Sequence, residues 1–148
     1  MCIRDRHMDE WERRRGRVTV LTPHEGEFLR VGGDLPQGRT AAAEDFARRS
    51  GAVVVLKGPG TVVAGPDGRC RVNTTGNCGM AKGGSGDVLT GIVAALLAQG
   101  ATAVRAAAVG VWLHGRAGDL AAQEKGQWGM TPTDLLERLP QALREVTE

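Results

Sequence analysis

The chain has 148 residues, of which 41% are hydrophobic and 24% are charged, and its formal net charge is +2. This length and composition are typical of one compact domain with its own core, and they exclude a largely disordered chain. The 22 glycines, with only 2 phenylalanines and no tyrosine, favour closely packed α/β layers built on Val, Leu, Ile and Ala.

The charge and cysteine patterns exclude several classes of partner. Arginines crowd the N-terminal segment, residues 1–17, but they are interleaved with Asp and Glu, as in a solvated segment rather than a nucleic-acid-binding arm. Cys2, Cys70 and Cys78 form no CxxC pair, which predicts reduced thiols in a cytoplasmic protein and no metal site. The longest apolar run, residues 92–98, is too short to cross a membrane. We therefore expect neither nucleic acid nor a membrane as a partner.

The first half of the sequence reads as strands around one helix. Residues 18–21 and 52–56 are apolar runs typical of buried strands. Thr40 is placed to cap a helix that continues to about residue 49. Residues 61–64 and 70–73 flank a Pro-Asp-Gly turn, which predicts a hairpin.

The second half reads as a glycine-rich loop followed by helices. Residues 74–86 form the loop, and helices are expected over 87–99 and over 103–123. His114 lies in the middle of the second of these helices and is expected to pack in the protein core. Thr131 and Pro132 have the pattern of the cap and first residue of a last helix. The large apolar side chains of Met80, Trp112, Trp128 and Met130 are expected to pack inside. The order of elements predicts an α/β fold, with few strands for a complete sheet.

The glycine-rich loop carries the strongest chemical signal. It holds glycines at positions 76, 79, 83, 84 and 86 and leads directly into a helix, whose first amides and dipole favour an anion such as a phosphate. Asp87 follows at the helix start, where it would either cap the helix or act as a base on an attacking hydroxyl. The loop is neither a Walker-type P-loop nor a Rossmann fingerprint.

Four stretches in order resemble one family. GGSGDVLTG at residues 83–91 resembles the glycine-aspartate signature of the ADP/ATP-dependent NAD(P)H-hydrate dehydratases, the YjeF C-terminal domain family. TPHEGEF at 22–28, LKGPGTV at 56–62 and WLHGRAGD at 112–119 resemble further segments of that family. The resemblance implies a ribokinase-like three-layer α/β/α sandwich. It implies that residues 18–148 are the C-terminal part of that domain, which lacks its N-terminal part here, and it leaves residues 1–17 unassigned.

The same resemblance implies a lyase reaction that repairs a damaged metabolite. NADHX or NADPHX, the hydrated cofactor, would be phosphorylated on its ring hydroxyl by ADP or ATP with Mg²⁺, and phosphate would then be eliminated to give NAD(P)H. The likeness to bacterial members favours ADP, which would become AMP and phosphate. It also implies a homo-oligomer and an epimerase domain as a fused or separate partner.

The resemblance assigns roles to individual residues. Asp87 would be the catalytic base and contact the hydrate, and His24 would bind the hydrate. The residues implied to bind the nucleotide are Lys57, Gly58, Pro59, Gly60, Thr61, Asn77, Gly79, Lys82, Gly83, Gly84, Ser85 and Gly86. By themselves, Lys57 could be a surface lysine and His24 a structural histidine.

Two other functions fit parts of the same sequence. A ribokinase-like small-molecule kinase would share the glycine loop and the aspartate, but its product would keep the phosphate. A truncated module would bind a nucleotide or a partner chain without turnover. Release of inorganic phosphate coupled to recovery of the reduced nicotinamide separates the dehydratase from both.

Overall fold

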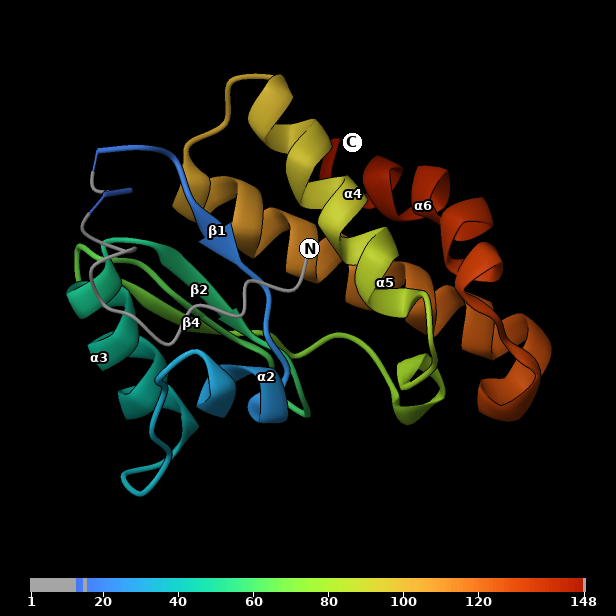
Figure 1. The fold of residues 1–148 in the computed structure, drawn as a ribbon. Coiled ribbons are helices and arrows are strands. Elements are labelled where there is room, and N and C mark those ends of the chain that lie inside the picture. The colour runs from blue at the N-terminus through green and yellow to red at the C-terminus, as the bar shows by residue number, and fades with distance from the viewer. Residues whose placement is uncertain (1–12, 15, 148) are drawn as a thin grey trace. The chain divides into compact units, whose positions relative to one another are not determined.

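The computed structural model describes residues 13–14 and 16–147, and most of the unassigned N-terminal segment, with Cys2, lies outside them. The chain divides into two compact units, Met1–Val72 and Asn73–Glu148. Each unit is a contiguous half of the sequence with its own secondary structure (Figure 1).

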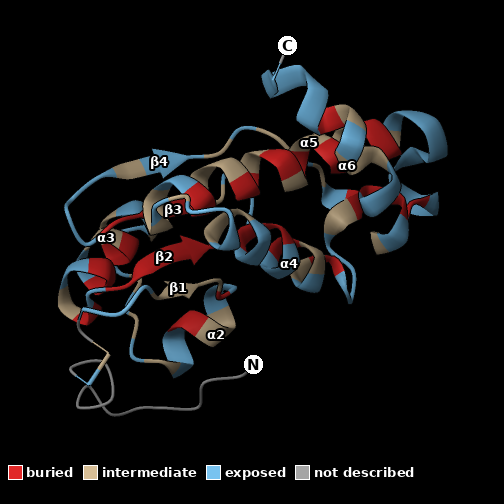
Figure 2. Ribbon diagram, turned by 90° about the horizontal axis from the view of Figure 1, so that it is seen from above, coloured by how far each residue is buried: buried red, intermediate tan, exposed pale blue. Residues whose placement is uncertain are grey.

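The first unit is built on a four-stranded mixed sheet in the order β1-β2-β3-β4. These strands are β1 (Val20–Leu21), β2 (Val53–Leu56), β3 (Val62–Ala64) and β4 (Cys70–Val72). β1 runs parallel to β2, and the other neighbours are antiparallel. The predicted strands and hairpin are therefore confirmed, with shorter ends. β2 is buried along its whole length, as its run of β-branched residues predicts (Figure 2).

Two helices complete this unit, α2 (Glu25–Arg30) and α3 (Arg39–Ser50). α3 packs against β2 and β3 and was expected from the sequence, whereas α2 was missed. The prediction that Thr40 caps α3 is wrong, because Gly38 is the cap and Thr40 lies within the first turn. The rings of Phe28 on α2 and Phe46 on α3 lie 5.3 Å apart between centroids. Both rings pack in one cluster with Val54 and Leu56 of the sheet, so the two phenylalanines of the chain fasten both helices to one core.

The second unit is helical, with a short 3-10 turn, η1 (Cys78–Met80), and the helices α4 (Ser85–Ala98), α5 (Ala103–Gly129) and α6 (Pro132–Thr147). α5 packs against both α4 and α6 (Figure 1). The contact between α4 and α5 is close at Gly110, where a Cβ would lie 2.8 Å from Cγ2 of Val93. α5 extends six residues beyond its predicted end at residue 123, across a break at Gly126 with φ 71°.

The start of α6 was predicted from its sequence, and its cap is more elaborate than expected. Pro132 is the first helical residue, and the Asp134 carboxylate accepts hydrogen bonds from the amide and the hydroxyl of Thr131, at 2.6 and 2.8 Å. Among the described residues, the structure contains no helix that is both long and apolar enough to cross a membrane.

Candidate functional site

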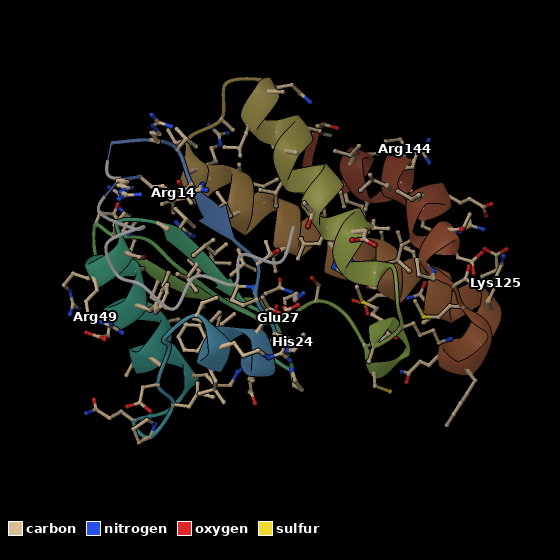
Figure 3. The ribbon with its side chains drawn as sticks, in the orientation of Figure 1. Arg14, His24, Glu27, Arg49, Lys125 and Arg144 are labelled. Carbon is tan, nitrogen blue, oxygen red and sulfur yellow. The ribbon has the colours of Figure 1, made fainter. Side chains whose placement is uncertain are left out.

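His24 lies at the N-terminus of α2 and caps it. Its Nδ1 accepts the Glu27 amide at 3.2 Å, and Glu27 Oε2 accepts the His24 amide at 2.8 Å, a reciprocal capping box (Figure 3). A Cβ on Gly26 would lie 3.1 Å from Cε1 of His24, so a glycine leaves room for the ring. Half of the His24 side chain, 52%, remains exposed.

The sheet brings Lys57 to this capping box. The residue after β2 forms a parallel bridge with His24, and its amide donates to the Pro23 carbonyl at 2.8 Å. The Lys57 ammonium lies 3.7 Å from Glu27 Oε2. Burial opposes ionisation of Glu27, but the His24 amide and the charges of Lys57 and His24 outweigh it and lower the pKa of the carboxyl. The structure therefore joins two of the predicted site residues through a carboxylate that was not among them.

The turn after Lys57 is compact and rich in glycine. Gly58 and Gly60 have positive φ values of 151° and 63°, which glycine adopts readily. The Thr61 hydroxyl donates to the Gly58 carbonyl at 3.0 Å and closes the turn. The turn is further held by Arg39, at the start of α3, which donates to the carbonyls of Leu56 and Pro59. Sequence reasoning did not find Arg39.

The glycine loop ends at the N-terminus of α4, where hydrogen-bond donors are left without partners. Gly84 is the cap, with φ 92° and no side-chain hydrogen bond. Within the described part of the chain, the amides of Gly83, Gly84 and Gly86 donate to no other atom. Three unpaired amides at the positive end of a 14-residue helix form the kind of cradle that binds phosphate.

Asp87 is the third residue of α4, and it does not cap the helix. The capping interpretation is therefore wrong: Gly84 takes that place. The Asp87 side chain is exposed and forms no hydrogen bond or ion pair with any described residue. A carboxylate beside unpaired amides, with no structural partner of its own, is available to a ligand.

Asp119 on α5 fixes the part of the loop that precedes the cradle. Its carboxylate accepts the Gly76 amide at 2.9 Å and the Asn77 side-chain amide at 3.0 Å. Asn77 in turn accepts the amide of Gly79 at 3.0 Å and caps η1. Asp119 was not singled out, although it ends the stretch WLHGRAGD that carries part of the resemblance.

Lys82 and Ser85 are also tied to α5. The Lys82 ammonium donates to the carbonyls of Trp128 and Met130, at 2.9 and 2.5 Å, so its charge lies at the C-terminal end of the helix. Ser85 is buried, and its carbonyl lies 2.9 Å from Nε2 of His114. His114 is half-buried, and it joins α5 to the start of α4.

One expectation about packing is wrong. Met130 is buried, and Met80 and Trp112 pack against buried clusters, but Trp128 is 98% exposed. It follows the break at Gly126, where the chain leaves the helical path. The three carbonyls that Lys82 approaches belong to this short segment.

The predicted site residues thus fall into two groups, one in each unit. His24 and the turn 57–61 belong to the first unit, and the loop 77–86 with Asp87 belongs to the second. The first group is a capped helix start beside a glycine turn. The second is an anion cradle with a free carboxylate.

The fold and this loop define a class. The structure is similar to a ribokinase-like superfamily protein from Enterococcus faecalis, with a TM-score of 0.74 and 35% identity over 85% of this chain and 44% of that one. An ADP/ATP-dependent NAD(P)H-hydrate dehydratase from Bacillus subtilis, co-crystallised with ATP/Mg²⁺, has a TM-score of 0.81 and 37% identity over 86% of this chain and 48% of that one. The chain is therefore a ribokinase-like α/β protein.

The sequence comparisons are more specific. The NAD(P)H-hydrate dehydratase family matches residues 2–141, and this chain belongs to that family. The match begins inside the segment that sequence analysis left unassigned. The chain is 50% identical to the bifunctional NAD(P)H-hydrate repair enzyme Nnr of Moorella thermoacetica, over 87% of this chain and 25% of the relative. It is 47% identical to the ADP-dependent (S)-NAD(P)H-hydrate dehydratase of Neisseria meningitidis, over 72% and 38%. The chain thus spans between a quarter and two fifths of these relatives.

Proposed function

We propose that this chain takes part in the nucleotide-dependent dehydration of NADHX or NADPHX to NAD(P)H, a reaction of metabolite repair. The observation that carries the proposal is the start of α4, where unpaired amides of Gly83, Gly84 and Gly86 adjoin the exposed, partner-free Asp87. A phosphate held by such amides beside a carboxylate is the arrangement that phosphoryl transfer to a hydroxyl needs.

Asp87 serves as the base in this proposal. It accepts the proton of the ring hydroxyl while the hydroxyl oxygen attacks the terminal phosphorus of ADP or ATP, and AMP or ADP leaves. The C–O bond of the phosphate ester then breaks, and inorganic phosphate leaves with the bonding electrons. The neighbouring ring carbon loses a proton, and a double bond forms between the two ring carbons. The amides of the loop stabilise the charge that develops on the transferred phosphoryl group.

The other site residues bind and orient. Lys57, Gly58, Pro59, Gly60 and Thr61 line the nucleotide site, and His24 contacts the hydrate through its exposed ring. Asn77, Gly79 and Ser85 shape the loop, since their polar groups are held by the chain itself. Lys82 contributes its position in the loop, because its ammonium is held by carbonyls at the end of α5.

A magnesium ion fits this site only together with the nucleotide. Among the described residues, no group of three or more His, Cys, Asp or Glu side chains could hold a metal. Magnesium commonly keeps several waters and binds through substrate phosphates and one or two carboxylates. When bound with the nucleotide, it would neutralise phosphate charge, and we assign it no side chain here.

The wider setting of the reaction is part of the same proposal. Those called bifunctional repair enzymes suggest that an epimerase domain works with this one, as a fused or separate partner. We propose a cytoplasmic homo-oligomer whose small-molecule partners are the hydrate and ADP or ATP.

The test of this function measures two products in one reaction. The purified chain is mixed with NADHX, magnesium and either ADP or ATP, and reduced-nicotinamide absorbance and inorganic phosphate are followed together. Formation of reduced nicotinamide and inorganic phosphate in equal amounts, dependent on the nucleotide, supports the dehydratase. A phosphorylated product without phosphate release would identify a kinase instead, and nucleotide binding with neither product would identify a binding module.

A further inference from the structure

Arg39, the first residue of α3, contacts both the turn after β2 and the helix α2. Its Nη2 donates to the Leu56 carbonyl at 3.0 Å, and its Nη1 donates to the Pro59 carbonyl at 2.5 Å and lies 3.5 Å from the Gly60 carbonyl. Its Nε lies 3.0 Å from Oε1 of Glu25 on α2. The planar guanidinium thus spans the turn that follows β2 and reaches back to the helix that His24 caps.

The contact is also sterically close. A Cβ on Gly58 would lie 2.5 Å from Nη2 of Arg39, so a side chain here would displace the guanidinium, and the positive φ of 151° also favours glycine. The Arg39 side chain is 24% exposed. Its two terminal nitrogens donate to main-chain carbonyls, whereas the buried Nε pairs with Glu25 by charge alone and makes no hydrogen bond in the described residues. Arg39 is therefore engaged by the protein itself and is not a free cation waiting for an anion.

These carbonyl contacts determine where the amides of the turn point. A trans peptide group is planar, with its C=O and N–H on opposite sides. Because Arg39 draws the carbonyls of Pro59 and Gly60 toward itself, the amides of Gly60 and Thr61 point away from it. Neither amide donates a hydrogen bond to any residue that the structure describes. The turn consequently offers two amide donors, three and four residues after Lys57 in the sequence.

We propose that Arg39 is a positioning residue of the nucleotide site, which turns the amides of Gly60 and Thr61 outward as donors for an anionic or carbonyl group of ADP or ATP. This inference rests on the proposed function, since it takes the turn 57–61 as part of the nucleotide site. The inference adds a residue that lies outside the four stretches on which the resemblance rests. It also gives a physical reason for the sequence Gly-Pro-Gly after Lys57.

The experiment compares Arg39→Lys with Arg48→Lys, a conservative change on the exposed face of the same helix. A lysine cannot span several carbonyls as the guanidinium fork does. We expect Arg39→Lys to bind ADP and ATP roughly tenfold more weakly, as the loss of charge-assisted hydrogen bonds implies, while Arg48→Lys binds like the wild type. In turnover, KM for the nucleotide should rise more than kcat falls.

Hydrogen exchange of the nucleotide-free chain gives a second readout that does not depend on activity. Arg39→Lys should speed exchange of the Gly58 amide, which donates to Thr61 Oγ1 across the turn at 3.4 Å, and leave α3 protected. Arg39→Ala should behave in the same way, and added guanidinium ion should restore nucleotide affinity to it. Faster exchange with unchanged nucleotide affinity, or no change in either, would overturn the inference. A wild-type chain that binds neither ADP nor ATP would overturn the proposed function, and this inference with it.

Discussion

Asp119 on α5 accepts a hydrogen bond from the Asn77 side chain, with 3.0 Å between Oδ1 and Nδ2, and its second oxygen accepts the Gly76 amide. A residue in the long helix thus fixes the loop that leads to the cradle. The two partners lie 42 and 43 residues away in the sequence, so local patterns do not show the contact.

Removal of this carboxylate should loosen the nucleotide loop. Asp119→Ala leaves the Gly76 amide and the Asn77 side chain without their acceptor, which we expect to cost about 1–3 kcal/mol of unfolding free energy. Nucleotide affinity should fall roughly tenfold, as measured by calorimetric titration. Asp45→Ala, at an exposed position on α3, serves as the control and should keep the wild-type affinity. An Asp119→Ala chain with wild-type affinity would show that the loop needs no such anchor.

Two helical glycines offer a matched pair of substitutions. A Cβ on Gly115 would lie 2.2 Å from Oγ1 of Thr75 and 2.8 Å from its backbone, whereas one on Gly91 meets nothing within 4 Å. We expect Gly115→Ala to lower the free energy of unfolding by about 1–3 kcal/mol through overpacking. Gly91→Ala should raise it by about 1 kcal/mol through helix propensity. Urea unfolding measures both, and equal stabilisation by the two would mean that the loop does not pack on Gly115.

The cap of α6 predicts how stability depends on acid. The Lys125 side chain, whose Nζ is 2.5 Å from Asp134 Oδ1, and then the Thr131 amide and hydroxyl lower the pKa of Asp134 from 3.8 to about 2. Because the folded chain favours the charged Asp134 carboxylate, this carboxylate contributes its full stabilisation of the fold above the unfolded pKa of 3.8. It is lost as the pH falls toward the folded pKa.

Asp134→Asn tests this dependence. The difference in unfolding free energy between wild type and Asp134→Asn should stay constant from neutral pH to the unfolded pKa of 3.8 and shrink below it. Urea unfolding at a series of pH values measures that difference. A difference that widens in acid would contradict the lowered pKa.

Local patterns in the sequence were enough to predict most elements of the fold. The β-branched run became β2, the Pro-Asp-Gly turn joins β3 to β4, and Pro132 begins α6. α2 was missed because it has only 6 residues and begins at a histidine cap, which is not among the usual capping residues.

The site was predictable only in part, for a physical reason. The glycines and Asp87 stand together in the sequence, so their chemistry could be recognised there. Arg39 acts on carbonyls 17 to 21 residues away, and such contacts depend on how α3 packs on the sheet. The exposure of Trp128 depends likewise on the break at Gly126, since a continuous helix would have continued the apolar pattern.

The role of Asp87 is the central claim, and one comparison tests it most directly. Wild type and Asp87→Asn are mixed with NADHX, magnesium and ADP or ATP, and the return of reduced-nicotinamide absorbance is followed alongside nucleotide affinity. Since the Asp87 side chain is exposed and makes no hydrogen bond or ion pair with the described residues, the variant should fold and bind nucleotide like the wild type. We expect the wild type to recover NADH and Asp87→Asn to lose at least a hundredfold in rate, about the effect of removing a general base. Recovery at the wild-type rate by Asp87→Asn would contradict the assignment of Asp87 as the base.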